Sequence, residues 1–175
     1  MKQYLLLGLM VVATAQTIQK HAEFEDALSD VQQDMWVWRS EASNMKTFRI
    51  VDELGTSEVR FQICVKPYNT SANITLHIDD IRYSNDGPSD NVTVRFNNIV
   101  LATFTTTERW RSGHEWNIFK NSGPLGPSLN LSPGQYFIQV NVRTDTWGIE
   151  LDRIRVNAEN QDPMSPLFCG SQLLL

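Results

Sequence analysis

The chain has 175 residues, of which 41% are hydrophobic and 20% are charged, so wholesale disorder, a coiled coil and a multidomain assembly are poor interpretations. Asp and Glu number 20 against 15 Lys and Arg, and the resulting net charge of −5 leaves no basic surplus for binding nucleic acid. Five Trp, eight Phe and four Tyr can fill a core, and two Cys are too few for a disulfide-stapled miniprotein.

Residues 1–15 have the pattern of a secretory signal peptide. Lys2 precedes an apolar run over 5–12, and Ala13-Thr14-Ala15 puts small residues at the −3 and −1 positions of a cleavage site before Gln16. The alternatives are a buried helix or a membrane anchor, but the run is too short to span a bilayer. We therefore expect a secreted, extracellular protein with no membrane span.

Four Asn-x-Ser/Thr sequons agree with a secretory route. They begin at Asn69, Asn73, Asn91 and Asn130, and glycosylation there requires an exposed backbone. Asn69 and Asn130 fall in expected loops, whereas Asn91 opens an expected strand. The sequence therefore predicts a glycoprotein, with Asn69 and Asn130 as the better acceptors.

Cys64 and Cys169 are the only cysteines in the chain. In an oxidising compartment an even number favours pairing, which would fasten the carboxy-terminal tail to a central strand. Two separate intermolecular disulfides are the alternative. No Cys/His cluster with the spacing of a zinc site is present in the sequence.

Alternating apolar and polar residues predict β-strands along most of the remaining chain. The clearest strands are 59–65, 74–78, 92–96, 136–142 and 147–151. Turn-forming clusters separate them at 67–69, 84–88, 96–98, 122–124 and 132–134. This arrangement predicts an all-β fold, an antiparallel β-sandwich.

Three segments depart from simple alternation. The apolar phase slips by one residue from Ile78 to Ile81 and again from Leu151 to Ile154, which predicts a bulge or a change of facing at each place. Residues 17–34 are compatible with either a helical turn or an edge strand. From residue 158 the chain is polar and contains proline, so 158–175 are expected to form a tail.

Several stretches, in order, resemble the family 6 and family 35 carbohydrate-binding modules. Arg82-Tyr83-Ser84-Asn85-Asp86-Gly87, followed by the strand over 92–98, is similar to their first motif. Residues 131–138 and 148–156 are similar to their last two strands, and Ala22-Glu23 is similar to the pair that opens them. The resemblance implies a galactose-binding-like jelly roll over 16–157 that binds sugars without cleaving them.

The resemblance also implies a structural Ca²⁺ that joins the two ends of the domain. Its motifs place the ligands at Glu23 and Asp152, with Glu25 as a third. Oxygen ligands from distant parts of the chain suit Ca²⁺. The alternative is that these acids are solvated or paired with Arg153 or Arg155.

Sugar recognition in such modules uses aromatic and polar side chains on loops at one end of the sandwich. An aromatic ring packs against the C–H face of a pyranose, and polar groups bond its hydroxyls. The matching residues in this chain are Tyr83, Asn85, Trp110, Arg111, His114, Glu115, Trp116 and Asn117.

Core packing and turn formation compete with these functional interpretations. Trp116 alternates with Ile118 as in a strand, so it is as compatible with the core as with a ligand platform. Trp36, Trp38 and Trp147 are expected mainly to pack inside the protein. Asn85, Asp86 and Asp90 have the ligand types of a loop calcium site, but Asn-Asp-Gly-Pro is first of all a turn.

The sequence thus predicts a secreted, non-catalytic, lectin-like domain whose partners are extracellular glycans or glycoproteins. A structural acidic glycoprotein of an extracellular matrix or mineralised tissue is the alternative. An enzyme is disfavoured because the chain has no nucleophile elbow, no phosphate-binding glycine loop and no paired zinc histidines.

Overall fold

The computed structural model describes residues 16–24, 27–29, 36–51, 56–68, 72–108 and 116–169. Its strands are β1 (Thr17–Glu23), β2 (Leu28–Ser29), β3 (Trp36–Trp38), β4 (Lys46–Ile50), β5 (Thr56–Val65), β6 (Ile74–Ser84), β7 (Asn91–Phe96), β8 (Ile99–Thr105), β9 (Lys120–Asn121), β10 (Leu125–Leu131), β11 (Gly134–Arg143) and β12 (Ile149–Glu159). A 3-10 turn, η3 (Ser43–Met45), precedes β4. The expected signal peptide lies outside the described residues.

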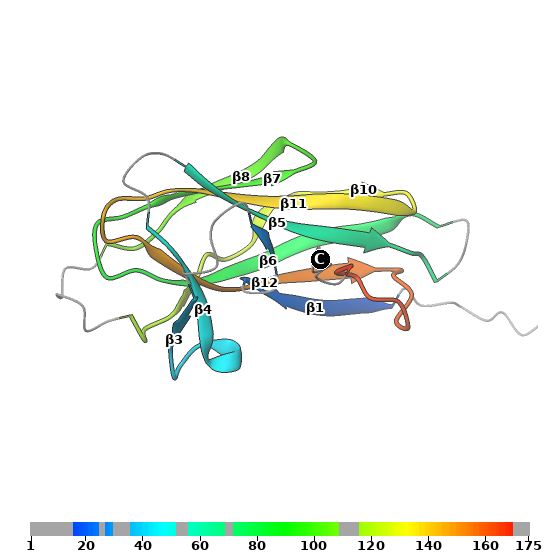
Figure 1. The fold of residues 1–175 in the computed structure, drawn as a ribbon. Helices are drawn as coiled ribbons and strands as arrows, with labels where there is room; N and C mark the ends of the chain where they lie inside the picture. Colours follow the sequence, from blue (N-terminus) through cyan, green and yellow to red (C-terminus); the bar gives the residue numbers. More distant parts are fainter. Residues whose placement is uncertain are drawn as a thin grey trace, which may run out of the picture.

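The strands form two antiparallel sheets packed face to face (Figure 1). A seven-stranded sheet has the order β10-β6-β12-β4-β3, with β1 also pairing β12 and β9 also pairing β6. A five-stranded sheet has the order β2-β5-β11-β7-β8. In Figure 1, β5 and β11 lie in the upper layer, and β12 and β1 lie in the lower one. The predicted antiparallel β-sandwich is confirmed.

Side-chain alternation explains how the two sheets share one core. On β11, Ile138, Val140 and Val142 are fully buried, while Phe137, immediately before them, is partly exposed. The same period places valines of β7 and isoleucines of β6 against them. One contiguous cluster of buried apolar residues therefore fills the space between the layers.

Both predicted phase slips are β-bulges, and they occur in neighbouring strands. The register between β6 and β12 shifts between Leu151 and Arg153, so Asp152 is the extra residue on β12. It shifts again where Arg155 and Val156 pair with Asp80 and Ile78, which makes Asp79 the extra residue on β6. A bulge lets a strand change its facing while its apolar residues stay in the core.

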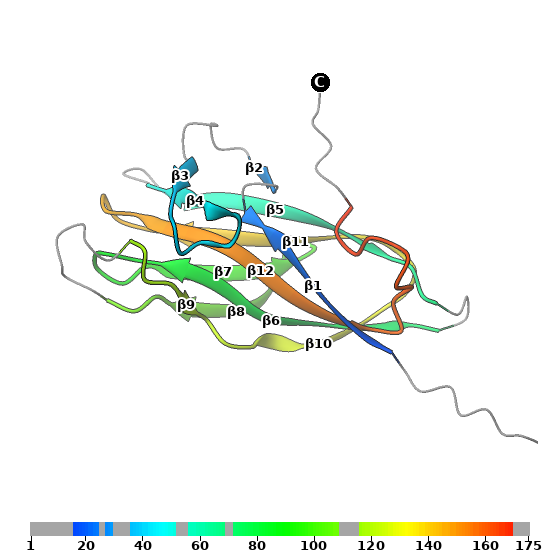
Figure 2. The same ribbon diagram turned by 90° about the horizontal axis from the view of Figure 1, so that it is seen from below.

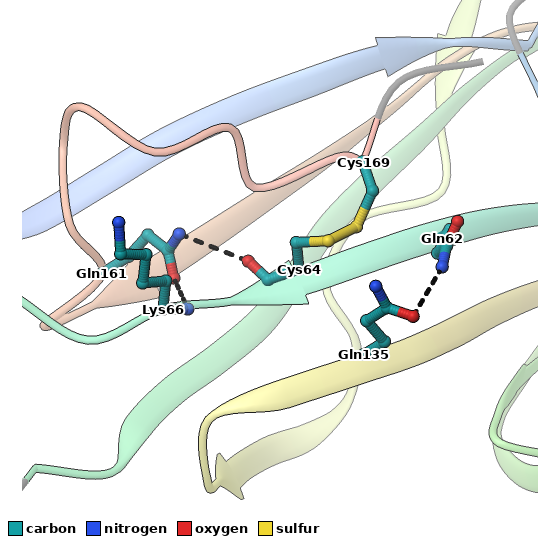
Figure 3. Close-up of a disulfide and its surroundings, with 6 residues drawn as sticks. All are labelled: Gln62, Cys64, Lys66, Gln135, Gln161 and Cys169. Carbon is teal, nitrogen blue, oxygen red and sulfur yellow. Dashed lines mark hydrogen bonds between the residues drawn. A yellow bond between two sulfur atoms is a disulfide. The ribbon is translucent and has the colours of Figure 1, made fainter. Parts of the chain in front are cut away.

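The carboxy-terminal segment is fastened along β5 (Figures 2 and 3). The expected disulfide joins Cys64 and Cys169, whose Cα atoms are 5.5 Å apart. The Cys64 amide donates to the Leu167 carbonyl at 2.7 Å, and Leu167 is buried. Gln161 accepts from the Lys66 amide at 3.0 Å and donates to the Cys64 carbonyl at 3.3 Å. Residues 160–169 therefore form a strap rather than a loose tail.

Several strands were not evident in the sequence. β12 continues to Glu159, two residues beyond the expected end of the domain, and β10 contains Asn130, which was expected in a loop.

The sequon asparagines Asn73, Asn91 and Asn130 are exposed, whereas Asn69 lies outside the described residues. None of the described segments forms a helix with the length and hydrophobicity that a membrane crossing requires.

Candidate functional site

The bulge on β12 turns Asp152 toward the first strand. Asp152 is fully buried and accepts hydrogen bonds from the Ser43 amide at 2.9 Å and the Ser43 hydroxyl at 2.7 Å. Its second oxygen accepts from Arg82 Nη1 at 2.5 Å. The structure thus brings the predicted ligand Asp152 to a polar node between η3, β6 and β1.

The second predicted ligand, Glu23, lies at the same node. Its Oε2 is 2.7 Å from the Ser43 hydroxyl, which also contacts Asp152. Burial raises the pKa of Glu23 above its ordinary value, and the negative charge of Asp152 adds to the increase. A serine hydroxyl has one proton, so it cannot donate to two ionised carboxylates at once. The node therefore fits an added proton or a cation between the two acids.

The ligand set for Ca²⁺ is only partly present among the described residues. Glu23, Asp152 and the Ser43 hydroxyl supply oxygen atoms, whereas Ca²⁺ takes six to eight. No group of three or more His, Cys, Asp or Glu side chains gathers in the described part of the chain. Glu25, the predicted third ligand, lies outside it. The two acids fit a hard cation, and backbone carbonyls or water would complete the site.

Tyr83 and Asn85 lie at the end of β6, beside Thr106 and Thr107, which precede the other predicted sugar-binding residues. The Tyr83 hydroxyl is 3.1 Å from Thr107 Oγ1, and Asn85 Nδ2 donates to Thr106 Oγ1 at 2.9 Å. Both are buried, and they line a narrow hollow with Thr107, Ile118 and Lys120. Their hydrogen bonds hold Thr106 and Thr107 in place, and their ligand role stays a prediction.

Trp116 is covered by cations from two other elements. It is 7% exposed, and the guanidinium carbons of Arg39 and Arg49 lie 5.8 and 4.9 Å from its ring centroid. Asn117 beside it is exposed. The other predicted loop residues, Trp110, Arg111, His114 and Glu115, lie outside the described residues, so their role as ligands stays a prediction.

Three other tryptophans are on the surface, so the expectation that they pack inside the protein is wrong. Trp36 and Trp38 are 48% and 69% exposed on the edge strand β3, and Trp147 is 48% exposed. Among the described strands β3 pairs with β4 alone, so it lies at the edge of its sheet, where less of the core packs against its side chains. Trp147 packs over Gly87, where even a Cβ atom would lie 2.8 Å from the Trp147 Cβ.

The loop acid Asp90 is buried near a second carboxylate. Burial raises the pKa of Asp90 to about 6, and the charge of Asp145 adds to the increase. Its backbone amide donates to Thr106 Oγ1 at 2.7 Å, in the turn that also holds Asn85. The 85–90 segment is thus a turn closed by hydrogen bonds, as the alternative interpretation expected.

Replacing Asp90 by asparagine is expected to stabilise the protein at pH 7. Between its ordinary pKa of 3.8 and about 6 the folded state binds more protons than the unfolded chain, so the free energy of unfolding falls as pH rises. Asparagine does not ionise, so at pH 7 the free energy of unfolding of Asp90→Asn should exceed that of the wild type by about 2–3 kcal/mol. Near pH 3.5 the two proteins should be equally stable. Urea denaturation at both pH values measures it, and an equal advantage at both would contradict the assignment.

A larger hollow lies on the outer face of the five-stranded sheet, away from all of these residues. Its volume is about 470 Å³, within the usual range of small-molecule sites. It is lined by Arg60, Asn97, Asn98, Gln135, Phe137 and Gln139. None of the residues predicted to bind a ligand lies on this surface.

The polar groups of this sheet-face hollow are held in place by one another. Asn97 Oδ1 accepts from the Phe137 amide at 2.8 Å, and the Asn98 amide donates to Gln139 Oε1 at 2.7 Å. Gln139 Nε2 donates to Asn98 Oδ1 at 2.6 Å. Asn97 and Asn98 have φ of 46° and 68°, the left-handed backbone that a tight hairpin turn requires and that asparagine tolerates. Because these side chains are ordered before a ligand arrives, binding loses less side-chain entropy.

The hollow combines an aromatic ring with amide groups. Phe137 is 38% exposed, so part of its ring is open to a ligand. Arg60 pairs with Glu58 at the rim, and Gln62 bonds Gln135 at 3.1 Å. Such a surface can stack a pyranose and bond its hydroxyl groups. The signal in the sequence is an outward phenylalanine among amides on β11, Gln135-x-Phe137-x-Gln139.

The fold is shared with solved sugar-binding modules. A family 35 carbohydrate-binding module from an environmental isolate matches with a TM-score of 0.54 and 16% identity, over 78% of this chain and 91% of that one. The carboxy-terminal family 6 module of a marine laminarinase from Zobellia galactanivorans matches with a TM-score of 0.52 and 17% identity, over 79% and 98%.

A larger enzyme contains the same fold. A cycloisomaltooligosaccharide glucanotransferase from Paenibacillus sp. matches with a TM-score of 0.54 and 16% identity over 78% of this chain, which spans 18% of that protein. No family model and no curated protein matches the sequence. At these identities the likeness is one of fold: the chain is a jelly roll like the family 6 and family 35 carbohydrate-binding modules.

Proposed function

We propose that the chain is a secreted, non-catalytic domain that binds extracellular glycans. The observation that carries this proposal is the hollow on the five-stranded sheet, where Phe137 lies among ordered amide side chains. The shared fold with carbohydrate-binding modules supports it. The signal-peptide pattern of residues 1–15 and the exposed sequon asparagines are consistent with secretion.

The surroundings of one buried acid, Glu150, argue against its use in hydrolysing a glycosidic bond. Glu150, which would be a candidate glycosidase carboxylate, is fully buried. Arg39 holds both of its oxygens, at 2.7 and 2.5 Å, and Thr47 Oγ1 donates to it at 3.0 Å. A carboxylate that is inaccessible and fully paired can neither protonate a glycosidic oxygen nor activate water.

Phe137→Ala is expected to weaken glycan binding by about tenfold or more. The substitution removes the ring on which the sugar stacks, and a loss of about 1.4 kcal/mol corresponds to that factor. A glycan array on the wild type identifies the oligosaccharide, and calorimetric titration of both proteins then measures the change.

Tyr68→Ala is the matched control, because Tyr68 is a highly exposed aromatic residue outside the hollow. Its affinity should equal that of the wild type. Unchanged binding by Phe137→Ala would show that the ligand lies elsewhere, and an array with no bound glycan would favour the structural glycoprotein.

We further propose that Ca²⁺ binds between Glu23 and Asp152 and stabilises the fold. Bound there, the ion would neutralise the two carboxylates that share Ser43 and would tie β1 and η3 to β12. The side chain of Arg82 already neutralises one oxygen of Asp152, so Glu23 is the acid with more to gain. The chemistry that the ion supplies is structural.

Calcium is expected to raise the melting temperature of the wild type but not that of Glu23→Gln. Ligand at a hundred times its Kd adds about 2.7 kcal/mol, which corresponds to roughly 5–10 °C for a domain of this size. Differential scanning fluorimetry with calcium or with chelator measures the shift. Glu159→Gln, on an exposed residue, is the control and should keep the full shift. An equal shift in Glu23→Gln would move the site away from this node.

A further inference from the structure

The edge strand β3 presents two indole rings to solvent on one side. Trp36 and Trp38 are two residues apart, so their side chains point to the same face of the strand, about 7 Å from each other along it. Val37 between them points the other way and is half-buried. In Figure 1, β3 and β4 project below the two layers of the sandwich. This pair is therefore an open aromatic surface.

An ammonium group lies against both rings. Lys46 on β4 pairs with Trp38 in the sheet register, and its Nζ is 5.1 Å from the Trp38 centroid and 5.8 Å from the Trp36 centroid. Among the described residues Lys46 has no carboxylate within ion-pair distance. Arg39 and Arg82 are, by contrast, each paired with a buried acid. The charge of Lys46 thus lies against two aromatic rings, and no acid among the described residues pairs with it.

The chemistry of this cluster selects an anionic sugar. A pyranose can stack on an indole while a carboxylate or sulfate group on the same sugar pairs with the ammonium. A neutral sugar offers Lys46 only hydroxyl oxygens, whereas a carboxylate or sulfate forms a stronger, charge-assisted hydrogen bond and balances its charge. A negative group is attracted here although the whole chain is acidic, because screening limits charge effects to about 8–10 Å.

We infer that Trp36, Trp38 and Lys46 form a second binding site, for sugars that carry carboxylate or sulfate groups. The inference rests on the proposed glycan-binding function, but it shares no residue with the sheet-face hollow. The two surfaces lie on different sheets, so a polysaccharide with charged and neutral segments would be bound at two points.

Three oligosaccharides of equal length test the inference: an oligogalacturonate, a sulfated galactan fragment and a neutral galactan fragment. The wild type should bind one or both charged probes, more weakly as salt is raised. Lys46→Gln, Trp36→Ala and Trp38→Ala should each weaken that binding about tenfold or more. Which charged probe binds distinguishes a carboxylate ligand from a sulfate ligand.

Two variants separate this site from the hollow. Phe137→Ala should leave the charged probes bound at this site unchanged, and Lys66→Gln removes an exposed ammonium elsewhere and should have no effect. Charged-probe binding that survives Lys46→Gln overturns the inference. If Phe137→Ala changes the binding of no probe, the sheet-face hollow is contradicted but the site at Lys46 is not. Binding to phosphatidylserine vesicles in place of all three sugars would overturn the inference in favour of a membrane surface.

Discussion

Replacing Glu150 by glutamine is expected to lower the free energy of unfolding by about 3 kcal/mol. Glu150 is fully buried between β4 and β6 and is bonded by both Arg39 and Thr47. Removing one charge of a buried pair leaves the other charge desolvated and unbalanced, and such changes cost about 3–5 kcal/mol. Urea denaturation at pH 7 measures the loss.

A double variant shows whether the cost comes from the unbalanced charge. Arg39→Met with Glu150→Leu replaces the whole pair with apolar side chains of similar size, and it should recover much of the lost stability. Glu159→Gln removes a charge from an exposed site and should change stability by less than about 0.5 kcal/mol. A loss in Glu150→Gln no larger than this control would contradict the importance of the pair.

Removing the disulfide with Cys64→Ala and Cys169→Ala is expected to cost about 4–5 kcal/mol. The bond closes a loop of 105 residues, and in the chain-entropy model a loop of that size restricts the unfolded chain by this amount. Leu167 and Gln161 should keep the strap docked on β5 in the folded state. Chemical denaturation under oxidising conditions gives the difference in unfolding free energy.

Met164→Ala is the control for the disulfide prediction, since Met164 lies on the same strap and is almost fully exposed. It should unfold at the denaturant concentration of the wild type. If removing the disulfide shifted that midpoint no more than Met164→Ala does, the strap would be held by its noncovalent contacts alone.

The sequence predicted the sandwich well where burial enforces a period of two. The strands over 59–65, 92–96 and 136–142 have fully buried residues at alternate positions, so their pattern is unambiguous. The two phase slips predicted the bulges at Asp79 and Asp152 for the same reason. The edge strand β8 was missed, because its first residues Ile99 and Val100 are exposed and break the pattern.

The candidate sites were predicted less completely. The resemblance placed Glu23 and Asp152, which the structure brings together through Ser43, but nothing in the sequence indicated that serine. Tryptophans were assigned by hydrophobicity, which failed for Trp36 and Trp38 because both rings stay exposed on β3 at the edge of the sheet. The hollow around Phe137 depends on a hairpin turn meeting β11 across the sheet, and such a contact follows from the register rather than from local sequence.

Mapping a bound glycan on the isotope-labelled protein tests the central claim most directly. We predict that the oligosaccharide selected on the array shifts the amide resonances of Phe137 and Gln139 on β11 and of Asn97 and Asn98 in the adjoining turn, with the side-chain amides of those residues among the largest changes. Shifts confined to the Tyr83 and Asn85 corner, with β11 unaffected, would contradict the claim that the outer face of the five-stranded sheet is the glycan-binding surface.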